Sequence, residues 1–163
     1  MSEFIYMPDT TIRRPAPQEQ AVIHRFVQSI VDETYTFVWP TGAPPIDATD
    51  WANGWVAEAQ DQIVAVMLTG GCWLDDLWVN AGFRGRGIGS ALLAKAEAEI
   101  AARGHDTALL RVVAGNGRAL HFYLKHGWKV QNQQAHERLP ISMITLAKNL
   151  TAAVATARPD HSA

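Results

Sequence analysis

Three glycines alternate with larger residues in the segment RGRGIG, residues 84–89, and this segment constrains the fold more than any other. The residues before it, 73–79, form a predicted strand, and from about Gly87 apolar residues recur at helical spacing. A glycine loop between a strand and a helix exposes the first backbone N–H groups of that helix. These groups and the helix dipole attract an anion, and glycine allows it to approach closely. The segment predicts a phosphate site, with a tight turn packed by glycines as the alternative.

The glycine segment departs from two well-known phosphate motifs. A P-loop needs a Lys directly after its last glycine, and Ser90 stands there. The dinucleotide fingerprint GxGxxG follows a first strand, whereas these glycines alternate and lie in the middle of the chain. The glycine segment is therefore either a third kind of phosphate site or a purely structural turn.

Length and composition indicate one globular domain. The chain has 163 residues, of which 48% are hydrophobic and 18% charged. We expect a flexible lead-in at residues 1–10, a single domain at 11–148 and a mobile tail at 149–163.

Charge and cysteine content narrow the class of protein. The formal net charge is −2, which disfavours a protein that binds nucleic acid. No apolar run approaches the roughly 20 residues of a membrane span. Cys72 is the single cysteine, so no internal disulfide can form and a reducing compartment is indicated. With no secretory signal visible at the N-terminus, we expect a cytoplasmic protein.

The hydrophobic pattern predicts an α/β domain with a mixed sheet. Residues 32–50 contain three prolines and several aromatics and are expected to form a structured loop that shapes a pocket. The expected strands are residues 11–14, 54–59, 63–68, 73–79, 107–113, 128–131 and 139–147, and the expected helices are residues 18–31, 87–103 and 118–125.

A second segment, NGRALHFYLKHGW at residues 116–128, extends the interpretation. It is similar to the pattern N-x-x-A-x-x-F-Y-x-K-x-G-F of the GNAT superfamily of N-acetyltransferases, with Trp128 in place of Phe. The segment RGRGIG resembles that family's [R/Q]-x-x-G-x-[G/A] signature, and LDDLWV before it resembles the family's fourth strand. The close resemblance covers about residues 74–130. It implies a mixed, mostly antiparallel sheet that splays between its fourth and fifth strands and is flanked by helices.

The resemblance also implies an acetyl-CoA site. The acetyl-pantetheine arm is expected in the gap of the splayed sheet, paired with backbone groups of two strand residues, as in β-augmentation. Backbone amides of the glycine loop are expected to bind the pyrophosphate, and two arginines add positive charge. An asparagine contacts the arm or caps the following helix, and the two roles are compatible. The residues assigned to acetyl-CoA are Leu77, Val79, Arg84, Arg86, Gly87, Ile88, Gly89, Ser90 and Asn116.

For catalysis, the resemblance assigns Tyr123 as the general acid that protonates the departing thiolate, the alternative being a core aromatic residue. An amine acceptor must lose a proton before it attacks, so a general base is expected. Asp75 and Asp76 point to opposite faces of their strand, so at most one of them faces the cleft. We prefer Asp76 as the base, against a purely structural role for both carboxylates, and Glu33 is a weaker candidate.

The expected function is acetyl transfer from acetyl-CoA to a primary amine of a small molecule or amino acid. The alternatives are a protein N-terminal or lysine acetyltransferase, a non-enzymatic acyl-CoA sensor, and a binder of other nucleotide phosphates. The expected partner is a small-molecule amine, with no nucleic acid, membrane or metal, and a homodimer is left open. Trp39, Trp51 and Trp55 either line the acceptor pocket or form a hydrophobic cluster that holds the long loop.

Overall fold

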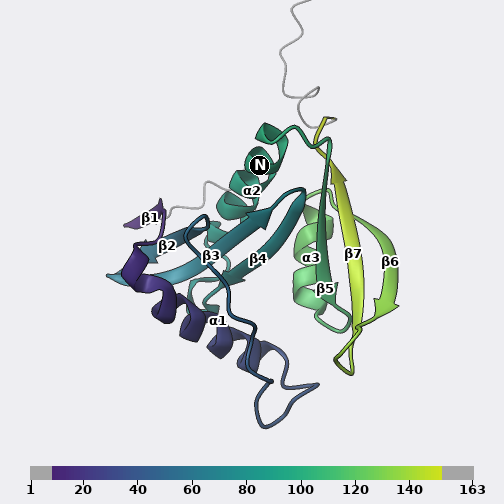
Figure 1. Cartoon of the computed structure of the whole chain (residues 1–163), viewed down its shortest axis with the longest axis horizontal. Helices are drawn as coiled ribbons and strands as arrows, with labels where there is room; N and C mark the ends of the chain where they lie inside the picture. The colour runs from purple at the N-terminus through teal and green to yellow at the C-terminus, as the bar shows by residue number, and fades with distance from the viewer. Residues whose placement is uncertain (1–8, 152–163) are drawn as a thin grey trace, which may run out of the picture. The chain divides into compact units, whose positions relative to one another are not determined.

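A computed structural model describes residues 9–151 of the chain, and Figure 1 traces its helices and strands. Within this range, no helix is long and apolar enough to cross a membrane. The elements in chain order are β1 (Thr10–Arg13), the 3-10 turn η1 (Pro17–Glu19), α1 (Gln20–Thr34), β2 (Trp55–Ala59), β3 (Gln62–Gly70), β4 (Trp73–Val79), the 3-10 turn η2 (Ala81–Phe83), α2 (Ile88–Ala102), β5 (Thr107–Val113), α3 (Gly117–Lys125), β6 (Lys129–Ala135) and β7 (Ser142–Asn149).

The strands form a mixed sheet of seven strands in the order β1-β2-β3-β4-β5-β7-β6. Four neighbouring pairs are antiparallel: β1 with β2, β2 with β3, β5 with β7 and β6 with β7. The pair β4–β5 is parallel, with Trp73 opposite Leu109. The predicted mixed, mostly antiparallel sheet flanked by helices is therefore confirmed.

The chain divides into two compact units, and each is described by itself. The first unit contains residues 9–69 and 74–96, with strands β1 to β3, most of β4, and helix α1. Helix α1 buries one stripe, formed by Ile23, Val27, Ile30 and Val31, because these residues recur at helical spacing. Strand β3 is buried over most of its length, which accounts for its nearly continuous apolar sequence.

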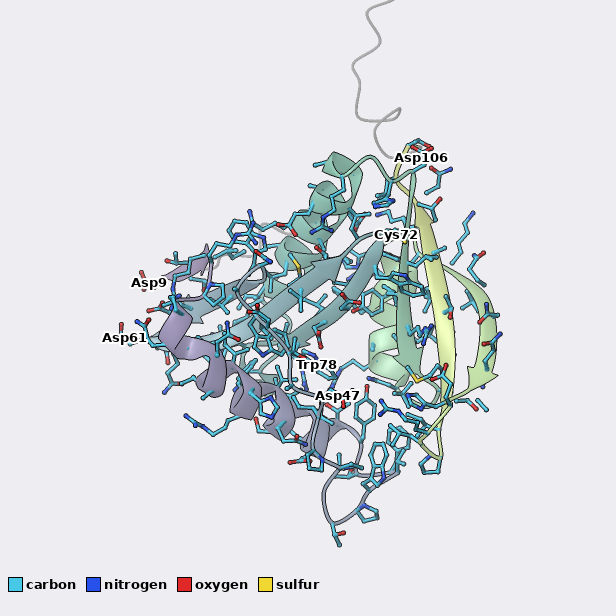
Figure 2. All side chains as sticks on the ribbon, in the orientation of Figure 1. Asp9, Asp47, Asp61, Cys72, Trp78 and Asp106 are labelled. Carbon is cyan, nitrogen blue, oxygen red and sulfur yellow. The ribbon has the colours of Figure 1, made fainter. Side chains whose placement is uncertain are left out.

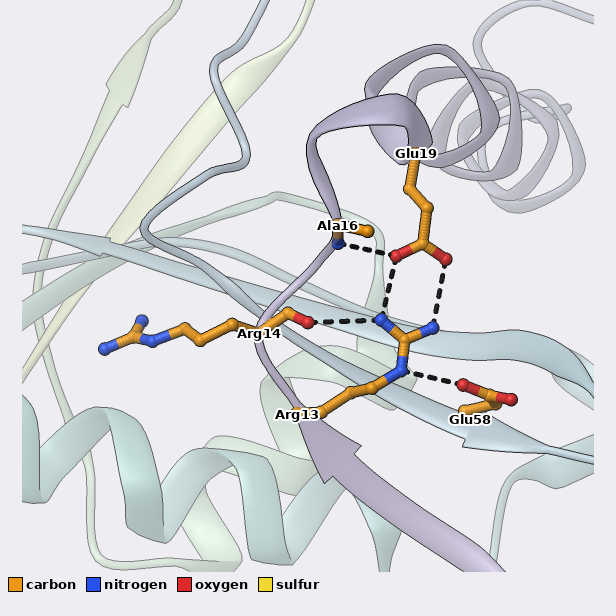
Figure 3. Close-up of polar contacts among 5 residues, drawn as sticks. All are labelled: Arg13, Arg14, Ala16, Glu19 and Glu58. Atoms are coloured by element: carbon orange, nitrogen blue, oxygen red, sulfur yellow. Dashed lines mark hydrogen bonds and ion pairs between the residues drawn. The ribbon is translucent and has the colours of Figure 1, made fainter.

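An ionic cluster joins β1 to β2 and to the start of α1 (Figure 3). Arg13 Nε donates to Glu58 Oε2 at 2.7 Å, and its two terminal nitrogens donate to the Glu19 carboxylate at 2.8 and 3.0 Å. The Ala16 backbone N–H also donates to Glu19, at 2.7 Å. Hydrogen bonds from Arg13 lower the pKa of Glu19, with the Ala16 N–H adding to this effect. A single guanidinium therefore connects β1 to β2 and to η1, the turn directly before α1.

The second unit contains residues 70–73 and 97–151. Strand β7 lies between β5 and β6, and it pairs with β5 from Met143 to Asn149. The Lys148 ammonium contacts Glu97 of α2 at 2.5 Å and donates to the His126 carbonyl at 2.8 Å. This half-buried lysine therefore connects β7 to α2 and to the end of α3.

The structure differs from the expected elements mainly at β6. This strand continues to Ala135, whereas the sequence predicts an end at residue 131, and its pairing with β7 shifts register between Val130 and Asn132. Every residue of β6 is exposed, so its sequence lacks the apolar alternation on which strand prediction depends. Backbone pairing with β7 determines this strand.

Smaller differences occur at helix and strand ends. Helix α1 extends to Thr34, three residues beyond the prediction, and β7 begins at Ser142 rather than 139. Residues 1–8 of the predicted lead-in and 152–163 of the predicted tail lie outside the described residues. Leu150, assigned by sequence to the tail, is buried, and its N–H donates to Asp106 O at 2.8 Å.

Candidate active site

The glycine segment forms the turn between β4 and α2. Asn80 starts this turn: its side chain accepts from Gly82 N at 2.8 Å, and its carbonyl accepts from Phe83 N at 2.9 Å. Gly85 and Gly87 have φ angles of 74° and 84°, the left-handed region that side chains rarely adopt. The first hydrogen bond of α2 runs from Ala91 N to Gly87 O at 3.0 Å. The predicted strand–glycine–helix turn is therefore present.

The beginning of α2 has the features that an anion site needs. A helix leaves the N–H groups of its first turn without intrahelical acceptors. Gly87 precedes the first turn and has no side-chain oxygen to cap them, unlike Ser, Thr, Asp or Asn. Ile88 is 1% exposed, so it can contribute to an anion site only through its backbone. Gly89 and Ser90 are half-buried and lie in the same turn.

Two arginines accompany this turn. Arg84 Nε donates to the carbonyl of Val79 at 3.2 Å, which ties its side chain to the last residue of β4. Arg86 is exposed, and its guanidinium lies 5.0 Å from the ring centre of Phe83. The turn therefore combines helix-terminal N–H groups with two permanent positive charges, a combination suited to a phosphate.

The end of β4 holds the two predicted base candidates and Trp78, which is labelled in Figure 2. Asp75 is exposed and Asp76 half-buried, as expected for neighbours on opposite faces of a strand. The Trp78 indole Nε1–H donates to Asp76 Oδ1 at 2.9 Å. Burial raises the pKa of Asp76; the indole N–H opposes this shift, and the charge of Asp75 adds to it. Leu77 and Val79, the proposed partners of the pantetheine arm, are half-buried.

Helix α3 holds the other predicted site residues. Asn116 is its N-cap, because the side-chain oxygen accepts from Ala119 N at 3.2 Å. Tyr123 is 7% exposed, and its ring packs edge-on against Phe122 and Trp128, with centroids 5.2 and 6.0 Å away. Tyr123 is thus packed in an aromatic cluster, and the capping role of Asn116 is confirmed.

The long loop after α1 is structured, as predicted, and polar side chains of α1 hold it. Gln28 accepts from Ile46 N at 2.8 Å, and Asp32 accepts from Ala43 N at 2.9 Å. Gln20 accepts from the backbone of Trp51 at 3.0 Å. Helix α1 therefore fixes the loop at three points along its length.

The aromatic residues of this region differ in exposure. Trp51 is 1% exposed, and Tyr35 is also buried, with Phe37 and Trp39 edge-on around it. Phe37 is exposed. Trp55 lies between the cations of Arg14 and Lys95, at 3.9 and 3.8 Å from its ring centre. Trp51 therefore belongs to the core, and Phe37 offers an apolar surface to solvent. Glu33, the weaker base candidate, is exposed at the end of α1.

Sequence reasoning missed the hydrogen bond between Trp78 and Asp76. The signal was present, because residues two apart on a strand point to the same face. Within residues 9–151, no group of three or more His, Cys, Asp or Glu side chains is placed to hold a metal ion.

Comparison with known proteins identifies the family. A comparison with curated sequences found no match. Among solved structures, apo YjaB from Escherichia coli is 25% identical, with a TM-score of 0.64 over 85% of this chain and 96% of its own. The protein yncA from Salmonella typhimurium, solved with its cofactor acetyl-CoA, is 14% identical, with a TM-score of 0.68 over 95% of this chain and 97% of its own.

Naa50 from Arabidopsis thaliana, solved with a bisubstrate analogue CoA-Ac-MVNAL, is 17% identical, with a TM-score of 0.61 over 86% and 99% of the chains. These similarities extend over nearly the whole of each solved chain and establish the fold. The model of the acetyltransferase (GNAT) family, whose acyl donor is acetyl-CoA, matches residues 24–128. The glycine turn and the helix of Tyr123 both fall within this match, and the chain belongs to the acetyltransferase (GNAT) family.

Proposed function

We propose that this protein transfers the acetyl group of acetyl-CoA to the primary amine of a small molecule or amino acid, with Tyr123 as general acid and Asp76 as general base. The observation that supports it most is the turn before α2. Gly85 and Gly87 with their positive φ angles, the N-terminus of α2 directly after Gly87, and the neighbouring arginines suit the pyrophosphate of acetyl-CoA, the donor of this family.

The donor is held mainly by backbone groups in this proposal. The amides of residues 86–90 bind the pyrophosphate, and Arg84 and Arg86 add positive charge. Each charge-assisted hydrogen bond contributes about 1.5–3 kcal/mol. Backbone groups of Leu77 and Val79, together with Asn116, pair with the pantetheine arm.

The reaction requires protons to leave the amine nitrogen and one proton to reach the departing thiolate. An alkylamine with a pKa near 10.4 costs about 4.6 kcal/mol to deprotonate at pH 7. Asp76 accepts this proton, directly or through one water, and the neutral amine attacks the thioester carbonyl. The C–S bond of the tetrahedral intermediate then breaks, and the Tyr123 hydroxyl protonates the departing thiolate. The attack leaves a positive charge on the amine nitrogen, which loses its second proton to solvent as the amide forms. Solvent also returns a proton to Tyr123 and removes the one held by Asp76, so the products are the amide, CoA and one proton.

The net charge supports the choice of acceptor. At −2 it does not favour a nucleic acid or an acidic macromolecule as the partner, so we favour a small amine. The main alternative is a protein N-terminus or lysine side chain; Naa50, bound to a bisubstrate analogue with a peptide part, shares this fold. The cytoplasmic location and a homodimer stay predictions.

The test combines acetyl-CoA with a panel of amines and peptides, following thiol release and the mass of the acetylated product. We expect turnover with small amines, and Tyr123→Phe is expected to lower kcat about 10²- to 10⁴-fold with little change in the KM for acetyl-CoA. Tyr35→Phe removes the same hydroxyl from another buried tyrosine and is the matched control.

Each alternative predicts a different result. Unchanged turnover in Tyr123→Phe contradicts the general-acid assignment. Stabilisation by acetyl-CoA without turnover of any amine supports the sensor. Equal stabilisation by ATP or NAD supports a general nucleotide site, and a preference for peptides over small amines supports the protein acetyltransferase.

A further inference from the structure

Asp76 is held at one oxygen by a neighbour on its own strand. The side chains of Asp76 and Trp78 lie on the same face of β4, because they are two residues apart. The indole Nε1–H donates to Oδ1 at 2.9 Å, a good length for a hydrogen bond to a carboxylate. The contact needs no loop or distant element, so the rigid strand itself sets its geometry.

The other oxygen of Asp76 is available for chemistry. Among the hydrogen bonds of residues 9–151, Oδ2 of this carboxylate accepts none. A carboxylate held at one oxygen cannot rotate freely about its terminal bond, so the position of the second oxygen is defined. This arrangement suits a group that must receive a proton at a fixed place.

Among residues 9–151, the one charge that shifts the pKa of Asp76 is that of Asp75. Asp75 acts on it through space, from the opposite face of β4. Strand β3, the neighbour of β4 within the same unit, has the sequence QIVAVMLTG, which contains no titratable side chain. Trp78 therefore supplies the principal interaction that favours the charged carboxylate in this part of the strand.

We propose that Trp78 is a positioning residue for Asp76, whose indole N–H anchors Oδ1 so that Oδ2 accepts the proton of the acceptor amine. The inference rests on the proposed function, in which Asp76 is the general base. Trp78 itself exchanges no proton. It restricts the carboxylate to one rotamer and stabilises its charged form.

The proposal has a defined consequence for pH dependence. Burial raises the pKa of Asp76 and the indole N–H partly offsets this, so loss of that N–H raises the pKa further. The base works only when deprotonated, so the acidic limb of the kcat/KM profile is expected to move to higher pH. One charge-assisted hydrogen bond corresponds to a shift of about one pH unit.

The sharpest variant replaces Trp78 by β-(3-benzothienyl)alanine, which keeps the shape of the indole and lacks the N–H. Trp78→Phe is the simpler second variant, which also removes the N–H. Trp73→Phe makes the same change on the same strand, three residues from Asp76 and thus on the opposite face, and is the matched control.

Two measurements are made on each protein: the pH profile of kcat/KM with the best amine, and the pKa of Asp76 by ¹³C NMR of labelled carboxylates without substrate. Asp76→Asn identifies the resonance. We expect both Trp78 variants to raise the Asp76 pKa and to lower kcat/KM about 10-fold on the acidic side, with KM for acetyl-CoA unchanged. Trp73→Phe is expected to change neither quantity.

The outcomes separate this inference from the proposed function. An unchanged Asp76 pKa in the folded benzothienyl protein overturns the positioning role, whether or not the enzyme is active. If the Trp78 variants raise the Asp76 pKa but the protein acetylates no amine, Trp78 still anchors Asp76 and the proposed function is contradicted. An active enzyme whose profile stays fixed while the pKa moves contradicts Asp76 as the base and overturns the inference with it.

Discussion

Replacing Arg13 by Ala tests whether the ionic cluster at the start of α1 stabilises the fold. The substitution removes one hydrogen bond to Glu58, at 2.7 Å, and two to Glu19, at 2.8 and 3.0 Å (Figure 3). It also removes the bond to the Arg14 carbonyl at 3.1 Å. Glu19 keeps the Ala16 N–H, so the start of the helix is weakened rather than lost.

The stability lost in Arg13→Ala should lie between the values typical of buried and of exposed ion pairs. Hydrogen bonds to charged groups contribute about 1.5–3 kcal/mol each, whereas exposed pairs contribute about 0–1 kcal/mol. The side chains of Arg13 and Glu19 are 32% and 20% exposed, and one guanidinium makes all the bonds, so their contributions do not add in full. We expect a loss of about 2 kcal/mol in the free energy of unfolding, or roughly 4–8 °C in Tm for a chain of this length.

The stability lost in Arg13→Ala should become smaller at acidic pH. Hydrogen bonds from Arg13 lower the pKa of Glu19 below its ordinary value of 4.5. A carboxylate with a lowered pKa contributes stability above the pKa it has in the unfolded chain, and this stability is lost as pH falls through the folded pKa. The difference between wild type and Arg13→Ala should therefore be complete at pH 7 and shrink below about pH 4.

Urea denaturation at pH 7 and at a series of acidic pH values measures this difference. Arg25→Ala removes the same side chain from an exposed position of α1 and should change stability by less than about 0.5 kcal/mol. A loss in Arg13→Ala no larger than in this control refutes the reasoning. A loss that persists undiminished at acidic pH shows that the packing of the side chain, rather than its ion pairs, stabilises the fold.

Three further predictions concern the site and the packing of the sheet. If Asp76 is the base, kcat/KM should fall at low pH with an apparent pKa above the ordinary value of 3.8, since burial raises the pKa of this carboxyl. Asp76→Asn should remove this fall in kcat/KM at low pH. Gly54→Ala places a Cβ 2.7 Å from the Met67 carbonyl and should cost about 1–3 kcal/mol in thermal or urea unfolding, whereas Gly117→Ala meets nothing within 4 Å and is the control. Gly87→Ala places a side chain on a residue with a φ of 84° and should lower the free energy of unfolding by about 1 kcal/mol. It should also weaken acetyl-CoA binding in calorimetry, and an unchanged affinity would contradict the pyrophosphate assignment.

The success of sequence reasoning differed between local and distant interactions. The strand at residues 73–79, the glycine turn and the strand at residues 107–113 were predicted at their observed bounds or within one residue, because local patterns of apolar residues and glycines specify them. The capping role of Asn116 was predicted for the same reason. In contrast, β6 could not be predicted to its full length, since an exposed polar strand has no hydrophobic pattern and forms by pairing with β7.

The sequence by itself determined the order of the elements, the glycine turn with its cations, and the membership of a family whose donor is acetyl-CoA. These depend on residues that are close together in the chain. Only the tertiary structure decided which of two adjacent carboxylates is half-buried and bonded to an indole, and which of the tryptophans enters the core. Burial and hydrogen bonding depend on what packs around a side chain, and segments far apart in the sequence supply most of that surrounding.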